Sequence, residues 1–90
     1  MLKIQFDKKF KKDYKRVLKR GCRPEEMEKV LTLLASEQVL PAKYRDHALS
    51  GNYKNTRECH INPDWLLIYK IEKDLLLVRA IRTGSHSDLF

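Results

Sequence analysis

Apolar and polar residues alternate at the start of the chain and then recur at helical spacing. Leu2, Ile4 and Phe6 alternate with polar neighbours, which predicts a short strand. Asp7 is a suitable N-cap for a helix that runs to about residue 20, and Gly21 is the kind of residue that ends one. The first elements of the chain are therefore predicted to be a strand and a helix.

A second helix is indicated after Pro24, a residue that suits the first turn of a helix. Glu25 and Glu26 favour that end because its free N–H groups carry partial positive charge. The apolar positions follow the i, i+3, i+4, i+7 pattern of a helix packed on a core: Met27, Val30, Leu31 and Leu34. These four residues are therefore predicted to lie in the core.

The second half of the chain contains strand-like segments separated by residues that favour turns. A loop is predicted over 39–52, strands over 53–60, 65–71 and 75–81, and turns over 62–64 and 72–74. Helices followed by a run of strands predict an α+β fold. We expect one domain over residues 1–90, with a small, mainly antiparallel β-sheet and the two N-terminal helices packed on one of its faces.

Two successive hairpins bring distant chain positions to one end of the predicted sheet. Because antiparallel neighbours run in opposite directions, the end of the first strand, the start of the second and the end of the third lie there. These positions hold His60, then Asp64 with Trp65, then Arg82 leading to His86. Two histidines, a carboxylate and an arginine are expected to gather at this edge, whereas the topology does not place His47.

This set of side chains is suited to cutting RNA without a metal ion. Such cleavage needs a base for the 2′-hydroxyl proton, a cation for the phosphate and an acid for the departing 5′-oxygen. His60, Asp64 and His86 are candidates for the proton transfers. Arg82 can bind the phosphate through two parallel hydrogen bonds.

Simpler structural interpretations stay open for several of these residues. Trp65 and Phe90 are suited to stacking on bases, but Trp65 also opens an apolar strand, as core residues do. Asp64 follows a proline and can serve only to stabilise a turn. Arg57 and Arg82 are equally typical of surface ion pairs.

The net charge of +7 is concentrated at the start of the chain. Residues 1–20 contain nine Lys or Arg and two acids, 9 − 2 = +7, and the remainder balances at 10 − 10 = 0. The run is interpreted either as a solvated basic face or as a surface that attracts nucleic acid. The candidates for RNA contact are Lys8, Lys11, Lys12, Lys15 and Arg16.

Several other classes of protein are not indicated. Cys59 and His60 are neighbours on a predicted strand and point to opposite faces, and no Cys-x-x-Cys or His-x-x-x-His spacing exists, so no metal site is expected. The glycines are isolated, which argues against a phosphate-binding loop. No apolar stretch approaches the roughly 20 residues that span a bilayer, and no signal-peptide pattern is present. A cytoplasmic protein with reduced thiols is expected.

Three stretches, 46–51, 57–69 and 82–90, together resemble the YafQ-type branch of the RelE/ParE toxin superfamily. They read DHALSG, RECHINPDWLLIY and RTGSHSDLF, and the order of one strand, two helices and three strands also fits. The resemblance implies a RelE-like fold and the toxin of a bacterial type II toxin–antitoxin pair. Such toxins are endoribonucleases that cut mRNA in the ribosomal A site, and they need no metal or other cofactor.

The resemblance also assigns roles to residues whose motifs match. For catalysis, the matching positions are His86 as the general acid together with His60, Asp64 and His47. For substrate contact they are Arg82 and Phe90. Apart from these matches, Trp65 and Arg57 are further candidates for substrate contact. The general base stays open among the three catalytic residues other than His86. By the same resemblance, the basic first helix would face ribosomal RNA.

The implied partners are a cognate antitoxin with a small acidic segment, and mRNA and ribosomal RNA on the ribosome. DNA is expected only through the antitoxin complex, and no membrane is expected. The alternatives are a non-catalytic nucleic-acid-binding regulator and a gyrase-inhibiting member of the same superfamily. Retention of the histidines argues against the second, and a neighbouring small acidic reading frame would favour a toxin over a regulator.

Overall fold

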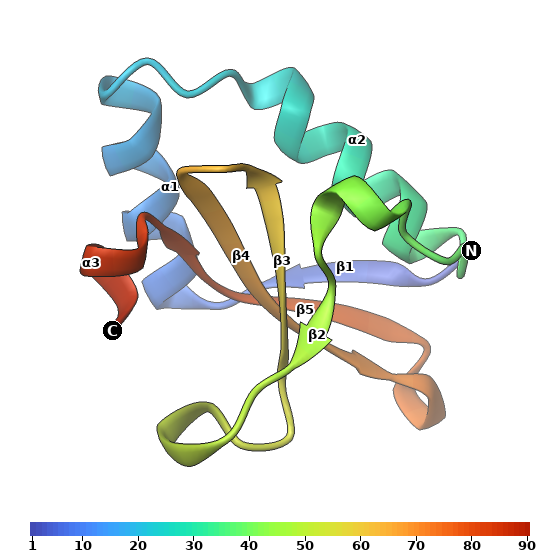
Figure 1. The fold of residues 1–90 in the computed structure, drawn as a ribbon. Helices are drawn as coiled ribbons and strands as arrows, with labels where there is room; N and C mark the ends of the chain where they lie inside the picture. Colours follow the sequence, from blue (N-terminus) through green and yellow to red (C-terminus); the bar gives the residue numbers. More distant parts are fainter.

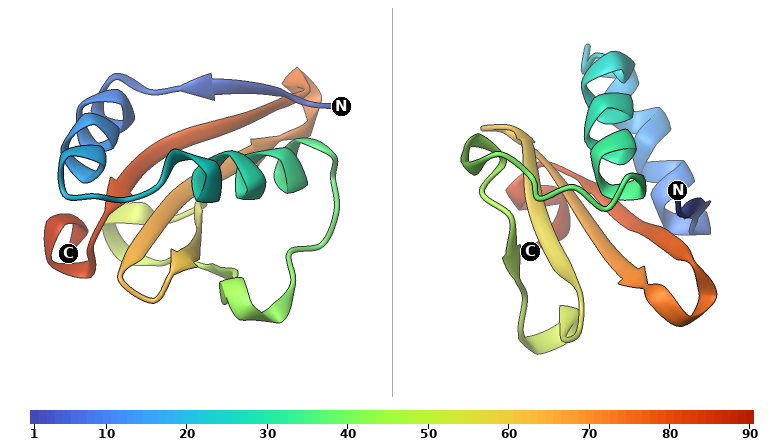
Figure 2. Two further views of the ribbon diagram at one scale, coloured as in Figure 1. Left: turned by 90° about the horizontal axis from the view of Figure 1, so that it is seen from above. Right: turned by 90° about the vertical axis from the view of Figure 1, so that its right-hand side faces the viewer.

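The protein folds as a mixed five-stranded β-sheet with two helices on one face and a short third helix after the last strand (Figures 1 and 2). The computed structural model describes residues 1–90. The strands are β1 (Lys3–Phe6), β2 (His47–Ala48), β3 (Arg57–Asn62), β4 (Trp65–Glu72) and β5 (Leu77–Gly84). The helices are α1 (Lys8–Lys19), α2 (Pro24–Ala35) and α3 (His86–Leu89), and short 3₁₀ helices lie at Ala42–Tyr44, Gly51–Tyr53 and Lys73–Leu75.

The sheet has the strand order β1-β5-β4-β3-β2 and is antiparallel except at one edge, where β1 runs parallel to β5. In this register Leu66 of β4 lies opposite His60 on one side and Gly84 on the other. The end of β3, the start of β4 and the end of β5 therefore meet at one end of the sheet. The predicted α+β fold with a mainly antiparallel sheet is confirmed, as is the meeting of these three strand ends.

The structure differs from the predicted elements around the loops of the second half. The strand predicted from residue 53 begins only at Arg57, because Gly51 and Asn55 adopt positive φ angles of 66° and 70° and turn the chain there. A strand of two residues, β2, lies inside the predicted loop. The last strand continues to Gly84 and is followed at once by α3, a helix that the sequence analysis did not predict.

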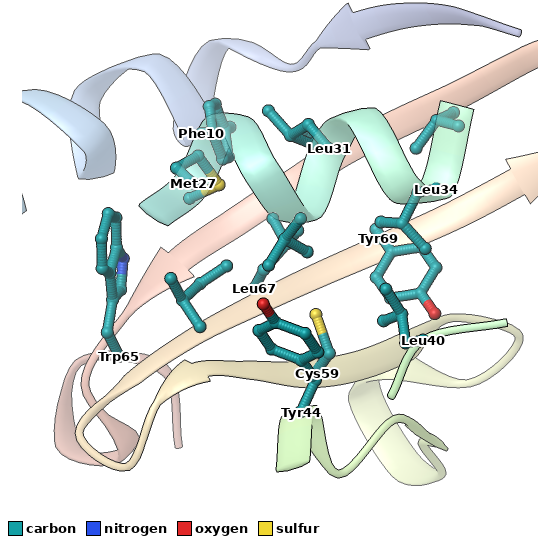
Figure 3. Packing of buried hydrophobic residues seen from close by; sticks show 14 of the residues in the cluster. Phe10, Met27, Leu31, Leu34, Leu40, Tyr44, Cys59, Trp65, Leu67 and Tyr69 are labelled. Carbon is teal, nitrogen blue, oxygen red and sulfur yellow. The ribbon is translucent and has the colours of Figure 1, made fainter. Parts of the chain in front are cut away.

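The main core lies between the two long helices and the face of the sheet that they cover (Figure 3). The four residues of the predicted apolar stripe, Met27, Val30, Leu31 and Leu34, are buried there, as expected. Alternate residues of β3 and β4, among them Cys59, Leu67 and Tyr69, point into the same core. Burial raises the pKa of the Cys59 thiol to about 12. No helix is long and apolar enough to cross a membrane.

A buried carboxylate, that of Asp13, fastens α1 to the end of β5. Asp13 is only 2% exposed. Its oxygens accept hydrogen bonds from Arg82 Nε at 2.6 Å and Nη2 at 3.1 Å, from Arg16 Nη2 at 2.6 Å and from the Thr83 backbone N–H at 3.2 Å. A buried charge is tolerated only when it is paired and hydrogen-bonded in this way. These bonds hold Arg82 beside α1.

Candidate active site

Two histidines flank one carboxylate on the sheet face that α1 and α2 leave open. Glu58 and His60 are two residues apart on β3 and so share a face, and His47 of β2 lies directly opposite Glu58. The Nε2 atoms of His47 and His60 each lie 3.5 Å from Oε1 of Glu58. Glu58 has only 6% of its side chain exposed, against 23% for His60 and 50% for His47. We call His47, Glu58 and His60 the triad.

A backbone contact of His47 determines which of its ring nitrogens faces Glu58. Nδ1 of His47 lies 2.8 Å from the carbonyl oxygen of Arg45. A carbonyl only accepts, so Nδ1 carries hydrogen and Nε2 can donate to Glu58 only when the ring is doubly protonated. The buried carboxylate thus lies within reach of one nitrogen of each imidazole. A group of this kind can take up a proton from a substrate and later release it.

His86 is held by α3, a single helical turn. Gly84 has a φ of 156°, and a Cβ there would lie 2.9 Å from Asp88 atoms, so the approach to the turn requires glycine. Ser85 and Asp88 form a capping box, with Ser85 N donating to the Asp88 carboxylate at 2.8 Å and Asp88 N to Ser85 Oγ at 3.2 Å. Arg20, at the end of α1, donates two hydrogen bonds to Asp88, at 2.6 and 3.0 Å.

Apolar and aromatic contacts hold the same turn against the open sheet face. Leu89 is buried in a small cluster with Leu66 and Ile68 of β4. The Tyr53 hydroxyl donates to the Leu89 carbonyl at 3.2 Å. The Phe90 ring meets Tyr53 edge-on and stacks on the His86 ring, with centroids 5.4 and 4.8 Å apart. His86 and Phe90 are themselves exposed. The turn thus presents an imidazole and an aromatic ring to solvent.

The triad and α3 lie on either side of the start of β4. His60 and Gly84 flank Leu66, so two strand spacings, about 10 Å, separate their backbones. His86 follows Gly84 by two residues, so β4 lies between the two strands that lead to His60 and His86. Both groups share the open face with the Leu66 and Ile68 side chains, against which Leu89 packs.

Arg82 provides a fixed positive charge beside α3. Asp13 binds the Nε and Nη2 side of the guanidinium, which leaves Nη1 without a carboxylate partner and able to donate to another acceptor. The hydrogen bonds to Asp13 hold the pKa of Arg82 above its usual value, and Tyr53 adds a smaller effect in the same direction. The side chain is 21% exposed. Arg82 therefore stays charged and can donate to a phosphate oxygen.

Three residues predicted for the site lie apart from the histidines. The Asp64 backbone N–H donates to Asn62 Oδ1 at 3.0 Å in an exposed turn, and its carboxylate makes no hydrogen bond or ion pair with a histidine. Trp65 is 1% exposed and donates to Thr83 Oγ1 at 2.7 Å inside the main core, so it offers no face to a base. Arg57 lies on the opposite sheet face and pairs with Asp46 at 3.2 Å. Only the simpler interpretations of Trp65 and Arg57 agree with these positions.

Glu58 is a member of the candidate site that the sequence patterns did not indicate. It stands two residues before His60 on the same strand, so the alternation of side chains was enough to place it beside that histidine. Its partnership with His47 was not accessible, because β2 is a strand of only two residues in a segment predicted to be a loop.

The basic helix α1 lies beside α3 (Figure 1). The lysines of α1 are exposed. Of the five predicted RNA contacts, Arg16 pairs with Asp13, and the lysines at 8, 11, 12 and 15 form no ion pair. Arg20 links the two helices through Asp88. The positive charge of the chain is thus unneutralised on a surface adjacent to His86.

A family model, a related sequence and solved structures were compared with this chain, and they point to the same family. A family model described as "Bacterial toxin of type II toxin-antitoxin system, YafQ" matches residues 2–90. The mRNA interferase toxin YafQ of Escherichia coli K12 is 41% identical over 88 residues, which cover 97% of this chain and 94% of the relative. A crystal structure of a metal-bound toxin from Helicobacter pylori is 48% identical, with a TM-score of 0.93 and complete coverage of both chains. YafQ in the E. coli DinJ–YafQ toxin–antitoxin complex is 38% identical, with a TM-score of 0.89 and coverage of 100% and 99%.

The chain belongs to the YafQ family of bacterial type II toxins. The resemblance inferred from the three sequence stretches is thereby confirmed, and the similarity of the structures confirms the predicted fold.

Low pH should weaken the attachment of α3. The bonds from Arg20 and Ser85 hold the pKa of Asp88 well below its usual value of 3.8. Because this pKa is lower in the folded than in the unfolded state, the carboxylate stabilises the fold fully above about pH 4 and progressively less below it. We expect the unfolding free energy, measured by urea denaturation, to fall more steeply below about pH 4 in the wild type than in Asp88→Asn. Asp74→Asn, an exposed control, should follow the wild type; equal slopes for all three proteins would contradict the prediction.

Proposed function

We propose that this chain is an endoribonuclease toxin that cuts mRNA on the ribosome by acid–base catalysis without a metal ion. The observation that carries the proposal is the common sheet face of the triad and of α3, with Arg82 beside them. A base, an acid and a fixed cation are the three groups that RNA cleavage needs. The E. coli relative named mRNA interferase supports the same substrate class.

In the proposed reaction, the RNA 2′-oxygen attacks the adjacent phosphorus as its proton passes to the triad. The bond from phosphorus to the 5′-oxygen breaks, and His86 donates the proton that this oxygen requires. The free end of the Arg82 guanidinium binds the phosphate oxygens as negative charge accumulates there. The products are a 2′,3′-cyclic phosphate, which hydrolysis converts to a 3′-phosphate, and a 5′-hydroxyl.

We assign the base to His60 within the triad. His60 lies on β3, one strand nearer to α3 than His47 of β2, and is the less exposed of the two imidazoles. Glu58 stabilises the imidazolium that forms on His60, and His47 is the second imidazole beside the same carboxylate. Phe90 is the exposed ring that can stack on a base, since its edge-on contact with Tyr53 leaves it 55% exposed. Asp64, Trp65 and Arg57 have no part in this proposal.

We further propose that a cognate antitoxin neutralises the chain and that DNA is reached only through that complex. The E. coli relative has been solved together with DinJ. An antitoxin segment rich in acids would be attracted to the unpaired lysines of α1 and could fold against them on binding. Such a segment would also shield α3, which is fastened to α1 through Arg20.

Removing the proposed acid should abolish most cleavage. His86→Ala is expected to lower the single-turnover rate about 10²–10⁴-fold, the usual contribution of a positioned acid. The fold should survive, because His86 is exposed and touches only Phe90 among the aromatic side chains. Cleavage of mRNA is measured beside the circular dichroism spectrum, with Ser87→Ala as the neighbouring control. A folded His86→Ala protein that cuts at the wild-type rate would remove His86 from the mechanism.

Replacing the Glu58 carboxylate with an amide of the same size should slow the reaction. Glu58→Gln keeps the size of the side chain but cannot stabilise an imidazolium, so we expect the cleavage rate to fall about 10- to 100-fold. Glu72→Gln, on the neighbouring strand β4, is the matched control. The assignment is wrong if both variants cut mRNA equally well.

The ribosome should accelerate cleavage, because the open face offers few groups to align a flexible RNA strand. In-line attack requires alignment of the 2′-oxygen, the phosphorus and the leaving oxygen, and such positioning is worth several kcal/mol. We expect the same message to be cut much faster on programmed ribosomes than free in solution. Equal rates would show a self-sufficient ribonuclease.

Changing Lys8, Lys12 and Lys15 to Glu should weaken ribosome binding and make it less dependent on salt, since fewer phosphates are contacted. Changing Lys29, Lys43 and Lys73 to Glu alters the charge equally and is the control.

A further inference from the structure

The C-terminal turn that carries His86 is tied to the basic helix by one ion pair. Arg20 Nη1 and Nη2 donate to the two oxygens of Asp88, at 2.6 and 3.0 Å, across 68 residues of sequence. This two-bond geometry fixes direction as well as distance. Arg20 is the C-cap residue of α1, so its backbone is held by the end of that helix.

Helix α3 needs such an attachment because it is too short to be stable alone. It has four residues, and helical turns of this length do not persist in water without tertiary contacts. The capping box lies within the turn and its approach, and the Leu89 and Tyr53 contacts hold its far end. Arg20 is the residue that fixes the turn to the helical layer. The orientation of α3 in turn determines where the exposed His86 ring points.

We propose that Arg20 is a positioning residue for catalysis: its pair with Asp88 sets α3 so that His86 and Phe90 face the triad. This inference rests on the proposed function, in which His86 is the general acid. In this proposal, Arg20 also connects the RNA-binding helix to the catalytic turn. Because Arg20 continues the helix that carries the exposed lysines, RNA-binding charge and the catalytic turn form one unit, and binding of α1 to a ribosome would orient His86 as well.

The expected pattern separates positioning from stability. An exposed ion pair contributes little to the stability of a fold, and Arg20 has 46% of its side chain exposed. Misplacement of a reacting group by about 1 Å, in contrast, can lower a rate about 100-fold. Arg20→Ala should therefore lower the unfolding midpoint only modestly, by no more than Asp88→Asn does, while it slows cleavage about 10- to 100-fold at saturating ribosomes.

The test measures single-turnover cleavage of one message on programmed ribosomes. The variants are Arg20→Ala, Asp88→Asn, the double variant of these two, Arg20→Lys, and Arg23→Ala as the control. Arg23 is an exposed arginine three residues away whose ion pair, with Glu25, is local. Asp88→Asn breaks the pair without removing positive charge from α1, so it separates positioning from ribosome binding. If Arg20→Ala does not fold, Asp88→Asn measures the same interaction.

We expect the two single variants and their double variant to be slow to a similar degree, since each lacks the same pair. Arg20→Lys should recover part of the rate, and Arg23→Ala should match the wild type. The heteronuclear NOE of the backbone amides of residues 87–90 should fall in Arg20→Ala and not in Arg23→Ala.

Wild-type cleavage by a folded Arg20→Ala protein, or additive losses in the double variant, would overturn the inference. So would an unchanged NOE over residues 87–90. His86→Ala, measured in parallel, separates this failure from that of the proposed function. If His86→Ala is slow and Arg20→Ala is not, only the positioning role is wrong; undiminished cleavage by His86→Ala would reject both.

Discussion

The carboxylate of Asp13 is the interaction on which the arrangement of the site depends. A charge that is 2% exposed would be costly without partners, and here two arginines and a backbone N–H supply four hydrogen bonds. Those bonds close α1 onto β5 just beyond the end of β1, where the sheet edge would otherwise be open. They also hold Arg82 at the border of the open face. One buried group thus seals the fold and presents the cation that the proposed reaction uses.

The two faces of the sheet divide stability from chemistry. The covered face carries the large core, in which alternate residues of β3 and β4 meet α1 and α2. The open face has a cluster of three buried apolar residues, one of them Leu89 of α3, and it carries the triad and Arg82. Adjacent residues of one strand therefore have opposite roles: Cys59 is in the core, and its neighbours Glu58 and His60 belong to the site. A strand register shifted by one residue would exchange them and destroy both faces at once.

Sequence patterns predicted the fold because its two long helices and its last two strands have strong periodicity. They also predicted that His60 and Arg82 lead to one end of the sheet. They could not place His47, because β2 is recognisable only by its pairing with β3, or α3, because a four-residue turn has no periodicity. Trp65 shows the opposite difficulty. It stands at the expected chain position, but alternation sends its ring into the core, where its indole N–H finds Thr83.

The placement of the catalytic candidates follows from what a small chain can bury. With the helices committed to one face, the remaining face has too little apolar surface for a second deep core, so the groups on it stay partly open to solvent. For the proposed RNA substrate, this openness gives access to His60 and His86, but it supplies few contacts that would align the strand. The rigid elements around the face, the capping box and the ion pairs of Asp13 and Asp88, fix the protein groups and not the substrate. Under the proposed function, alignment of the RNA would come from a surface outside the chain, and the unpaired lysines of α1, adjacent to α3, are where such a polyanionic surface would bind.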